Sequence, residues 1–474
     1  MHSRKIIISL LIAFTGCTVG PKYEPPSVVL PGDWQTPKTA DMQQCSADCF
    51  QWWRALNDPM LITLLENASN QNLDISIACA RILEARAELS GGAPFQYPHV
   101  DATAACGHAE VNKKLLNNLI GNHCYKSGRK KINYFECGFD AEWEIDLFGY
   151  NEHEINTLKA HIQATEYELK SLWVSLSAEI ARTYIELRGA QLKKELLEKN
   201  IASLKDTLEL IDSLATTGFA GTIDRKQAEQ QLYNYQAQEP LVELSIRKSI
   251  HKLSILLGYP PGELYPILTN KITLPIIPAE KPIGIPSELL RRRPDILKAE
   301  RDLAAATEQV GSAVAALFPR LSLTGFVGEL ATMATGSFAW YAGPSIVMPI
   351  FNSKMLEKDV KINKLKVKQA FYQYNKVILE ALEETENAIA AFSAEQQRRG
   401  FLTEAQKASS EGYQLTEDLY QQGLKNYLQV QESNQLLISA EENLLDSQAA
   451  LFLSYIALYK SLGGGWDYIE CDEK

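Results

Sequence analysis

The sequence predicts an α+β membrane protein in which two similar halves each supply two strands and a very long helical hairpin. Three observations predict this fold: an internal repeat, two long stretches without proline, and strand-like segments with one apolar and one acidic face. A chain of 474 residues that is 46% hydrophobic can bury a substantial core. Its net charge of −11 argues against a nucleic-acid partner, because nucleic acids bind basic surfaces.

The internal repeat is visible in the spacing of aspartate, proline and glycine. Two pairs of residues share one interval, namely Asp74 with Asp295 and Pro98 with Pro319. Two later pairs share a second, shorter interval, namely Gly218 with Gly423 and Gly258 with Gly463. The difference between the two intervals fits a loop at 113–131 that has no counterpart in the second half. These regularities predict an internal duplication.

The repeat divides the chain into parts. We expect a first structural repeat over 56–258 and a second over 287–463. A linker rich in proline, 259–286, joins them. The remaining parts are an N-terminal tether at 17–55 and a C-terminal tail at 464–474.

Each repeat contains a stretch whose length suits a very long helix. Proline is absent from Asn151–Thr217 and from Asn352–Gln422, and apolar residues of the second stretch recur at steps of three and four. A continuous helix of this length would extend roughly 100 Å. Such helices are stable when they pack along their lengths like coiled coils. We therefore expect helical hairpins over 150–258 and 352–463.

Strands are predicted just before each long helix, at 98–148 and 319–350. From Phe135 to Leu147, every second residue is apolar, which gives an extended strand one apolar face. Segment 319–328 alternates in the same way. The other face of the first segment carries five carboxylates, which we expect to line a water-filled pore: Glu136, Asp140, Glu142, Glu144 and Asp146.

Four strands of this kind cannot satisfy their own edges in a membrane. Each edge strand would leave backbone hydrogen-bonding groups unpaired in lipid, so only a closed barrel is stable there. An apolar outer face and a polar inner face are typical of a transmembrane β-barrel. The sequence therefore predicts a barrel shared between several chains.

The N-terminus reads as a secretory signal at 1–16. Arg4 and Lys5 precede the short apolar run Ile6–Phe14, which is far shorter than a membrane-spanning helix. The residues FTGC that end at Cys17 resemble a lipobox, although Phe14 stands where leucine is usual. This resemblance implies that Cys17 is acylated and becomes the mature N-terminus, and we expect no cofactor besides this covalent lipid.

The other cysteines leave several possibilities open. An oxidising compartment permits disulfides, but a single sequence cannot fix how the cysteines pair. A zinc site matches no standard spacing and is disfavoured against a disulfide or small buried thiols. The candidate disulfides are Cys45 with Cys49 and Cys124 with Cys106 or Cys137, and the conceivable zinc ligands are Cys106, His108, His123 and Cys124.

Four separated motifs resemble one family over nearly the whole mature chain. They are WEIDLFG at 143–149, LLRRRPDILKAE at 289–300, LFPRLSLTG at 317–325 and ALYKSLGGGW at 457–466. They are similar to the bacterial outer membrane factors, the TolC-like channels, and most of all to the lipoprotein branch of the multidrug efflux channels. The resemblance implies a homotrimer whose twelve strands, four from each chain, form an outer-membrane β-barrel. The barrel would continue into a long periplasmic α-helical barrel.

The resemblance also implies a gate at the turns of the two hairpins. In similar channels these turns hold a tyrosine, a basic residue and acidic residues that bridge neighbouring helices. Gln429 stands where an aspartate is common, so the resemblance departs from the family there. The gate residues that it implies are Asp224, Tyr420, Lys425, Gln429 and Glu432.

The resemblance implies an exit duct without enzymatic activity. It would conduct small molecules across the outer membrane, with a periplasmic adaptor and an inner-membrane pump as partners and outer-membrane lipid around it. Export of proteins by a type I system is the alternative, and a structural coiled-coil lipoprotein is a second one. A glycoside hydrolase that uses Glu142, Glu144 or Asp146 is disfavoured, because catalytic carboxylates face each other across a cleft. The substrate and the identity of the adaptor and pump are not encoded in recognisable motifs.

Overall fold

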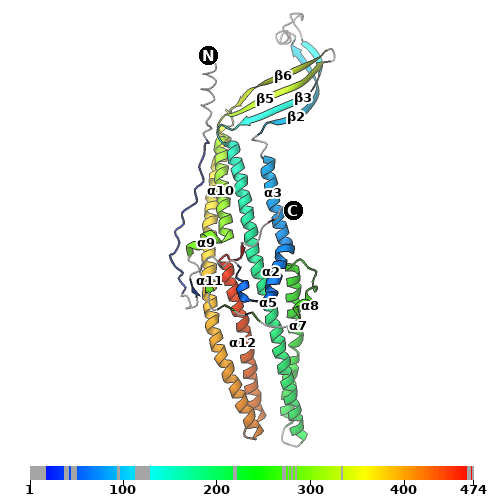
Figure 1. The fold of residues 1–474 in the computed structure, drawn as a ribbon, viewed down its shortest axis with the longest axis vertical. Coiled ribbons are helices and arrows are strands. Elements are labelled where there is room, and N and C mark those ends of the chain that lie inside the picture. The colour runs from blue at the N-terminus through cyan, green and yellow to red at the C-terminus, as the bar shows by residue number, and fades with distance from the viewer. Residues whose placement is uncertain are drawn as a thin grey trace. The chain divides into compact units, whose positions relative to one another are not determined.

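The computed structural model shows an α+β chain with a single main sheet and several very long helices (Figure 1). The signal peptide and Cys17 lie outside the described residues, as do Cys45, Cys49, His123 and Cys124. The structure describes residues 18–36, 42–43, 51–92, 97–112, 129–216, 221–269, 274–275, 277–278, 281–282, 286–332, 335–466 and 471.

The helices follow the expected order in both repeats. Among the described residues, no helix combines the length and the apolar character needed to cross a membrane. In the first repeat the helices are η2 (Arg54–Leu56), α2 (Pro59–Gln71), α3 (Leu73–Gly92), α5 (Tyr150–Thr216), α6 (Thr222–Gln236) and α7 (Glu239–Leu256). The short α8 (Tyr265–Leu268) follows, and the second repeat holds α9 (Pro286–Arg292), α10 (Pro294–Ala315), α11 (Ser353–Gln421) and α12 (Tyr427–Ser461).

The main sheet has four antiparallel strands in the order β2-β3-β5-β6 (Figure 1). The expectation of four strands per chain is confirmed. Two-residue strands β1 (Met42–Gln43) and β4 (Lys281–Pro282) form a separate parallel pair. The strands of the main sheet are β2 (His99–Asn112), β3 (Arg129–Ile145), β5 (Arg320–Thr332) and β6 (Thr335–Val347).

The sheet has one apolar face and one polar face, as its alternation predicts. Directly opposed residues share a face, so Trp143 lies with Leu323, and Val327 lies with Trp340. Phe139, Phe338 and Ile346 belong to the same apolar face and are also exposed in the single chain. Glu142 and Glu144 lie on the opposite face, across from Thr324 and Ser322.

Aromatic residues also occur on the acidic face, and Phe326 is the buried one among those described. Phe326 pairs with Asp140 in the register and therefore lies on the acidic face. Its ring covers the opposed glycines Gly138 and Gly328, where an added Cβ would come within 2.8 Å of ring atoms. Phe326 is 6% exposed and stacks on Tyr341 with 6.0 Å between ring centroids. The two glycines thus leave room for a large ring on an otherwise polar surface.

The described chain forms two compact units, and both repeats contribute to each. The first unit contains the main sheet, the sheet-proximal turns of α5 and α11 and most of α10. The second contains the remaining turns of α5 and α11, the return helices α6, α7 and α12, and the shorter helices α2 and α9. The core of the second unit is rich in aromatic side chains, and Trp173 donates from Nε1 to the carbonyl of Gly465 at 2.8 Å.

The second unit contains one contact twice, once in each repeat. In the first repeat, Asn72 donates from Nδ2 to the carbonyl of Leu256 at 2.7 Å. In the second, Arg293 donates from a terminal guanidinium nitrogen to the carbonyl of Ser461 at 2.8 Å. Each donor immediately precedes the helix that leads to the sheet, α3 in the first repeat and α10 in the second. Each carbonyl lies at the end of a return helix, α7 or α12. The duplication in the sequence is therefore a duplication of contacts.

Glycines allow each return helix to end against the start of its own repeat. Gly258 and Gly463 both have positive φ, 78° and 69°, which side chains other than glycine rarely adopt. An added Cβ at Gly258 would lie 2.5 Å from the carbonyl oxygen of Gln71. At Gly463 it would lie 3.1 Å from the Cα of Arg293. These glycines are the ones that marked the repeat in the sequence.

The contact at Arg293 is the more extensive of the two. The guanidinium donates to Asp295 at 2.8 and 3.1 Å and forms an ion pair with Glu384 at 2.8 Å. Burial alone would lower the pKa of Arg293, but hydrogen bonds and the charges of Asp295 and Glu384 outweigh burial and raise it. Beside it, Trp466 donates to the carbonyl of Arg292 at 2.7 Å. Two of the motifs that resemble the family, RRRPD and SLGGGW, therefore meet here.

The first return helix is broken, whereas the second is continuous. Helix α6 ends at Gln236 and α7 begins at Glu239, so the predicted hairpin at 150–258 has an interruption. Pro240 stands in the first turn of α7, where its missing N–H costs nothing but where it would remove a hydrogen bond inside a continuous helix. The second return helix, α12, has no proline and runs for 35 residues.

The structure contains a disulfide that the sequence reasoning did not predict. Cys79 of α3 is bonded to Cys471, with 5.8 Å between the Cα atoms. Cys106 and Cys137 are free and exposed, and both lie on the apolar face of the main sheet. No group of three or more metal-binding side chains occurs within the described ranges. Nothing local marks Cys79 and Cys471 as partners, because they are 392 positions apart.

The repeated contact makes a prediction about stability. Arg293→Met should lower the free energy of unfolding by about 1 to 2 kcal/mol, because it leaves the carbonyl of Ser461 without its donor and removes the ion pairs with Asp295 and Glu384. Asn72→Ala should cost about 1 to 2 kcal/mol, since Asn72 also accepts hydrogen bonds from Asp74 and Ile75 as the cap of α3. Urea unfolding of the purified protein measures both. Asn72→Ser separates the two roles and should cost less than alanine, because serine retains the cap of α3 but lacks the amide that donates to Leu256. Equal stability of Arg293→Met and the parent would contradict the prediction.

Candidate functional site

The tips of the two helical hairpins pack against each other in the second unit. A buried cluster joins Ile211 of α5, Ala228 of α6 and Tyr427 of α12. Leu208 of α5 and Tyr420 of α11 pack against it. All four hairpin helices therefore meet in one apolar contact, which we call the tip cluster.

Tyr420 and Asp224, two of the predicted gate residues, come together at the tip cluster. Tyr420 is partly buried, and its ring centroid lies 6.4 Å from that of Tyr427. Burial raises the pKa of Tyr420, and the negative charge of Asp224 adds to the rise. The same causes, burial first and then Tyr420 and Asp224, raise the pKa of Tyr427 to about 12. Both hydroxyls therefore stay protonated at neutral pH and can donate a hydrogen bond.

Asp224 also has a local structural role. It lies in the first turn of α6, and its carboxylate accepts a hydrogen bond from the backbone N–H of Gly221 at 2.9 Å. A carboxylate at a helix N-terminus is favoured by the helix dipole as well. A substitution at Asp224 therefore changes both a helix cap and a charge, and the two effects need separate variants.

The remaining predicted gate residues lie in or after the second turn. Lys425 is exposed between α11 and α12, after Gly423, whose φ is 75°. Glu432 is exposed on α12. Gln429 is half-buried, and its backbone N–H donates to the side chain of Asn426, which caps α12. These residues share the turn region, whereas the contact across the two hairpins is made by Ile211 and Ala228 with Tyr427.

The structure adds charged residues that the sequence reasoning missed. Arg225 of α6 forms an ion pair with Asp212 of α5 at 2.7 Å and with Glu229 at 3.4 Å. Lys226 pairs with Glu229 at 2.6 Å, and this hydrogen bond is the main cause that lowers the pKa of Glu229. Arg225 and Lys226 follow Asp224 directly in the sequence, and Glu229 stands four positions after Arg225. That spacing on a helix is the signal that could have identified the pair.

The acidic face of the sheet is partly neutralised within the chain. Glu144 accepts two hydrogen bonds from Arg320, at 2.8 and 2.9 Å, and Asp140 accepts one from Thr103 at 2.6 Å. Glu136 is half-buried and Glu142 is exposed. Strand β3 ends at Ile145, and the next residue, Asp146, accepts from the backbone N–H of Glu152 at 2.8 Å. Asp146 therefore stabilises the first turn of α5.

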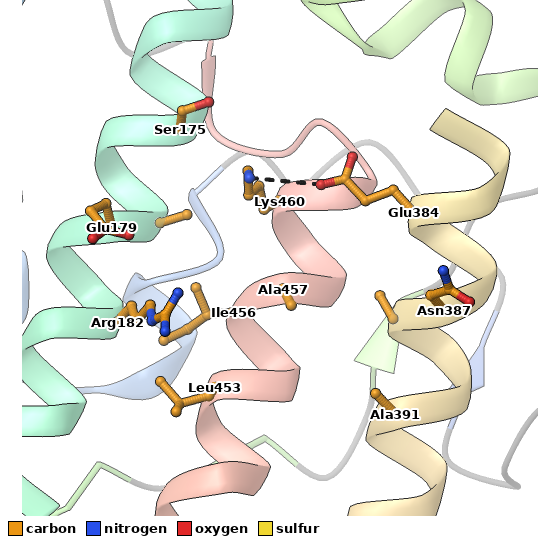
Figure 2. Close-up of a pocket in the computed structure, with 12 residues that line it drawn as sticks. Ser175, Glu179, Arg182, Glu384, Asn387, Ala391, Leu453, Ile456, Ala457 and Lys460 are labelled. Atoms are coloured by element: carbon orange, nitrogen blue, oxygen red, sulfur yellow. Dashed lines mark ion pairs between the residues drawn. The ribbon is translucent and has the colours of Figure 1, made fainter. Parts of the chain in front are cut away.

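A groove of about 480 Å³ lies between α5, α11 and α12 in the second unit (Figure 2). Figure 2 shows Lys460 pointing toward Glu384, and their charged atoms are 3.7 Å apart. The other charges of the lining are also paired, Glu179 with Lys252 and Arg182 with Glu186. Because its charges are neutralised within the chain, the groove carries no pattern that selects a ligand.

The residues that follow Cys17 in the sequence, Thr18 and Val19, contact the segment between β3 and α5. The backbone N–H of Val19 donates to the carbonyl of Phe148 at 3.1 Å, between the end of β3 and the start of α5. An added Cβ at Gly149, whose φ is 82°, would lie 2.8 Å from the side chain of Thr18. The segment that follows Cys17 is therefore packed where the sheet ends.

The capping role of Asp224 can be tested separately from the role of its negative charge. Asp224→Ala should weaken the start of α6 by about 1 kcal/mol, because it removes the acceptor for the N–H of Gly221. Hydrogen exchange of residues 221–224 should then accelerate about fivefold. Asp224→Asn retains an acceptor and should leave this exchange unchanged. Equal exchange in the alanine variant and the parent would show that the cap contributes nothing to the tip.

Comparisons with known proteins agree with this architecture. The family model described as outer membrane efflux protein matches residues 64–259 and 285–464. The solvent efflux pump outer membrane protein SrpC of Pseudomonas putida is 28% identical, over 98% of this chain and 99% of its own. The cation efflux system protein CusC of Escherichia coli is 26% identical, over 96% of this chain and 97% of its own.

Solved structures share the fold. The outer-membrane channel OprN is 32% identical, with a TM-score of 0.85 over 95% of this chain and 100% of its own. The CmeC outer membrane channel of Campylobacter jejuni is 23% identical, with a TM-score of 0.82 over 97% of this chain and 96% of its own. SrpC is named as an outer membrane protein, OprN and CmeC are named as outer-membrane channels, and all four matches extend over almost the whole chain. The chain belongs to the outer membrane efflux protein family.

Proposed function

We propose that this chain forms, as a homotrimer, the outer-membrane exit duct of a tripartite efflux system. The observation that carries the proposal is the four-stranded sheet, which has one exposed apolar face, one acidic face and two edge strands in a single chain. In a membrane the edges β2 and β6 need partners. Three copies would pair them in a ring of twelve strands, with Phe139, Trp340 and Ile346 toward lipid and Glu136 and Glu142 toward water.

The relatives support efflux over the other two functions considered. SrpC is named as part of a solvent efflux pump, CusC as part of a cation efflux system, and OpmQ of Pseudomonas aeruginosa as a pyoverdine export protein. An efflux duct needs an energy source and a connection to it, so we propose an inner-membrane pump and a periplasmic adaptor as partners. We expect passive conduction without catalysis by this chain. Because these relatives carry chemically different cargo on one fold, we propose that the pump selects the substrate.

We propose that the tip cluster is the closed state of a gate. Ile211 and Ala228 of the first hairpin pack on Tyr427 of the second, and Tyr420 packs against this cluster. The charge of Asp224 acts on both tyrosines, and Lys425 and Glu432 supply charges at the second turn. A contact made by one apolar cluster and a few polar groups can open at modest cost. A partner that binds the separated tips more tightly would shift the equilibrium toward the open duct.

We propose that Cys17 carries lipid and anchors the trimer to the inner leaflet of the outer membrane. Val19 is bound at Phe148, where the sheet ends and α5 begins. Cys17 lies two residues earlier, which allows at most about 7 Å of chain between them. An acyl chain at this level would enter the membrane beside the barrel.

The proposed gate predicts a change in conductance. In planar bilayers, Asp224→Asn should raise the ratio of open to closed channels about fivefold, if the lost charge contributes about 1 kcal/mol to closure. Lys425→Ala should act in the same direction. The controls remove charges of the same sign from exposed positions farther from the tips, Glu383→Gln and Lys407→Ala, both on α11. Conductance that equals the parent in both gate variants would refute the gate assignment. A protein that conducts neither as the parent nor as the gate variants would favour the coiled-coil spacer.

The acidic face predicts cation selectivity. Changing both Glu136 and Glu142 to glutamine should shift the reversal potential in a salt gradient toward anions, because six carboxylates would leave the lumen of a trimer. Glu329→Gln is the matched control, since Glu329 is exposed on the opposite, apolar face of the sheet. A parent channel that prefers anions would contradict the proposed lining.

A further inference from the structure

Two contacts join α6 of the first hairpin to α12 of the second near the tips. Ala228 of α6 and Tyr427 of α12 meet in the tip cluster. Farther along both helices, Gln435 of α12 donates from Nε2 to the hydroxyl of Tyr235 of α6 at 3.3 Å. On each helix, the two contacts are about two turns apart. The side chains between them therefore lie in a layer that both helices share.

Gln231 lies in this layer, on the side of α6 that faces α12. Tyr235 marks that side through its bond to Gln435, whereas Arg225 marks the side that faces α5 through its ion pair with Asp212. At 3.6 residues per turn, Gln231 is about 40° around the helix from Tyr235 and about 120° from Arg225. Gln231 therefore belongs to the contact with α12 rather than to the contact with α5.

The side-chain amide of Gln231 is buried without a hydrogen-bond partner. Gln231 is 7% exposed, and neither its Nε2 nor its Oε1 bonds another group of the described chain. Gln431 of α12, one turn after Tyr427, has a buried Oε1 that is likewise unpaired within the described ranges. The other buried side chains of α6 are apolar or, in Tyr235, hydrogen-bonded. We call the two glutamines the polar layer.

An unpaired amide weakens the contact that buries it. In water the donor and the acceptor of a glutamine are satisfied, so burying them without partners destabilises the buried state. When α6 and α12 separate, Gln231 and Gln431 return to water, and this cost disappears. A buried polar residue in a coiled coil acts in the same way, since it lowers the stability of the association while it specifies the register. The polar layer therefore favours separation of the two helices, compared with an apolar layer of the same shape.

We propose that the polar layer of Gln231 and Gln431 keeps the contact between α6 and α12 weak, so that the tip of the second hairpin can leave the first. The layer lies next to the tip cluster, which holds the hairpins together by apolar packing. The tip cluster thus favours contact, and the polar layer favours separation. The consequence for channel opening rests on the proposed gate, whereas the layer itself rests on burial and hydrogen bonding within one chain.

Hydrogen exchange of the purified full-length protein tests the layer. Helix α6 has 15 residues, and helices of this length are marginal in water without packing, so exchange of its backbone N–H groups reports its contact with α12. Gln231→Met replaces the amide by an apolar group of similar length and should slow this exchange about tenfold. Gln231→Glu retains the length but buries a charge, and it should accelerate the exchange by at least about tenfold.

Gln230→Met is the matched control, because Gln230 is exposed on the same helix and its amide is already in water. Its exchange should equal that of the parent. If Gln231→Met slows exchange no more than Gln230→Met does, the polar layer is refuted. Should Gln231→Met fail to fold, Gln431→Met decides. Removal of its unpaired Oε1 should slow exchange about fivefold, and parental exchange in that variant would refute the layer as well.

Conductance of the same variants separates the layer from the gate. In planar bilayers, Gln231→Met should lower the ratio of open to closed channels about tenfold if the channel opens by separation of α6 from α12. Slower exchange with parental conductance would support the layer and contradict only the proposed gate. A parent and variants that never conduct would contradict the proposed duct, and the exchange result would still decide the layer.

Discussion

The structure depends on the contact by which each return helix ends against the start of its own repeat. Asn72 and Arg293 supply the donors, and the carbonyls of Leu256 and Ser461 accept. A buried polar group that lacks a hydrogen-bond partner destabilises the folded protein. The last carbonyls of a helix have no partner within the helix, so they need donors from elsewhere in the chain. The ion pairs of Arg293 with Asp295 and Glu384 make the second of these contacts the stronger anchor.

Much of this fold could be predicted from the sequence because its signals are local and repeated. The proline-free stretches correspond to α5 and α11, and the alternation around Trp143 corresponds to the two faces of β3. Phe326 shows the limit of alternation, since the space that admits its ring comes from two glycines on neighbouring strands. The break between α6 and α7 follows from Pro240. The proline is visible in the sequence, but the sequence does not show whether it interrupts a helix or begins one. The disulfide between Cys79 and Cys471 depends on tertiary structure alone.

The candidate site was open to prediction only in part. Tyr420 and Asp224 were predicted as gate residues by resemblance, and this role stays a prediction. In the structure Tyr420 packs against the tip cluster, and the charge of Asp224 contributes to the raised pKa of Tyr420. The capping role of Asp224 and the pairing of Arg225 with Asp212 were not anticipated, because both depend on how α5 and α6 pack beside the turn.

The interruption at Ala237–Gln238 has a mechanical consequence. Helix α12 is an unbroken rod, whereas the corresponding arm of the first hairpin has a joint between α6 and α7. Bending is concentrated where a helix loses its continuous hydrogen bonds, so the two arms differ in stiffness although they descend from one duplicated unit. We therefore expect the first return arm to bend at this interruption, whereas α12, which has no proline, has no corresponding position.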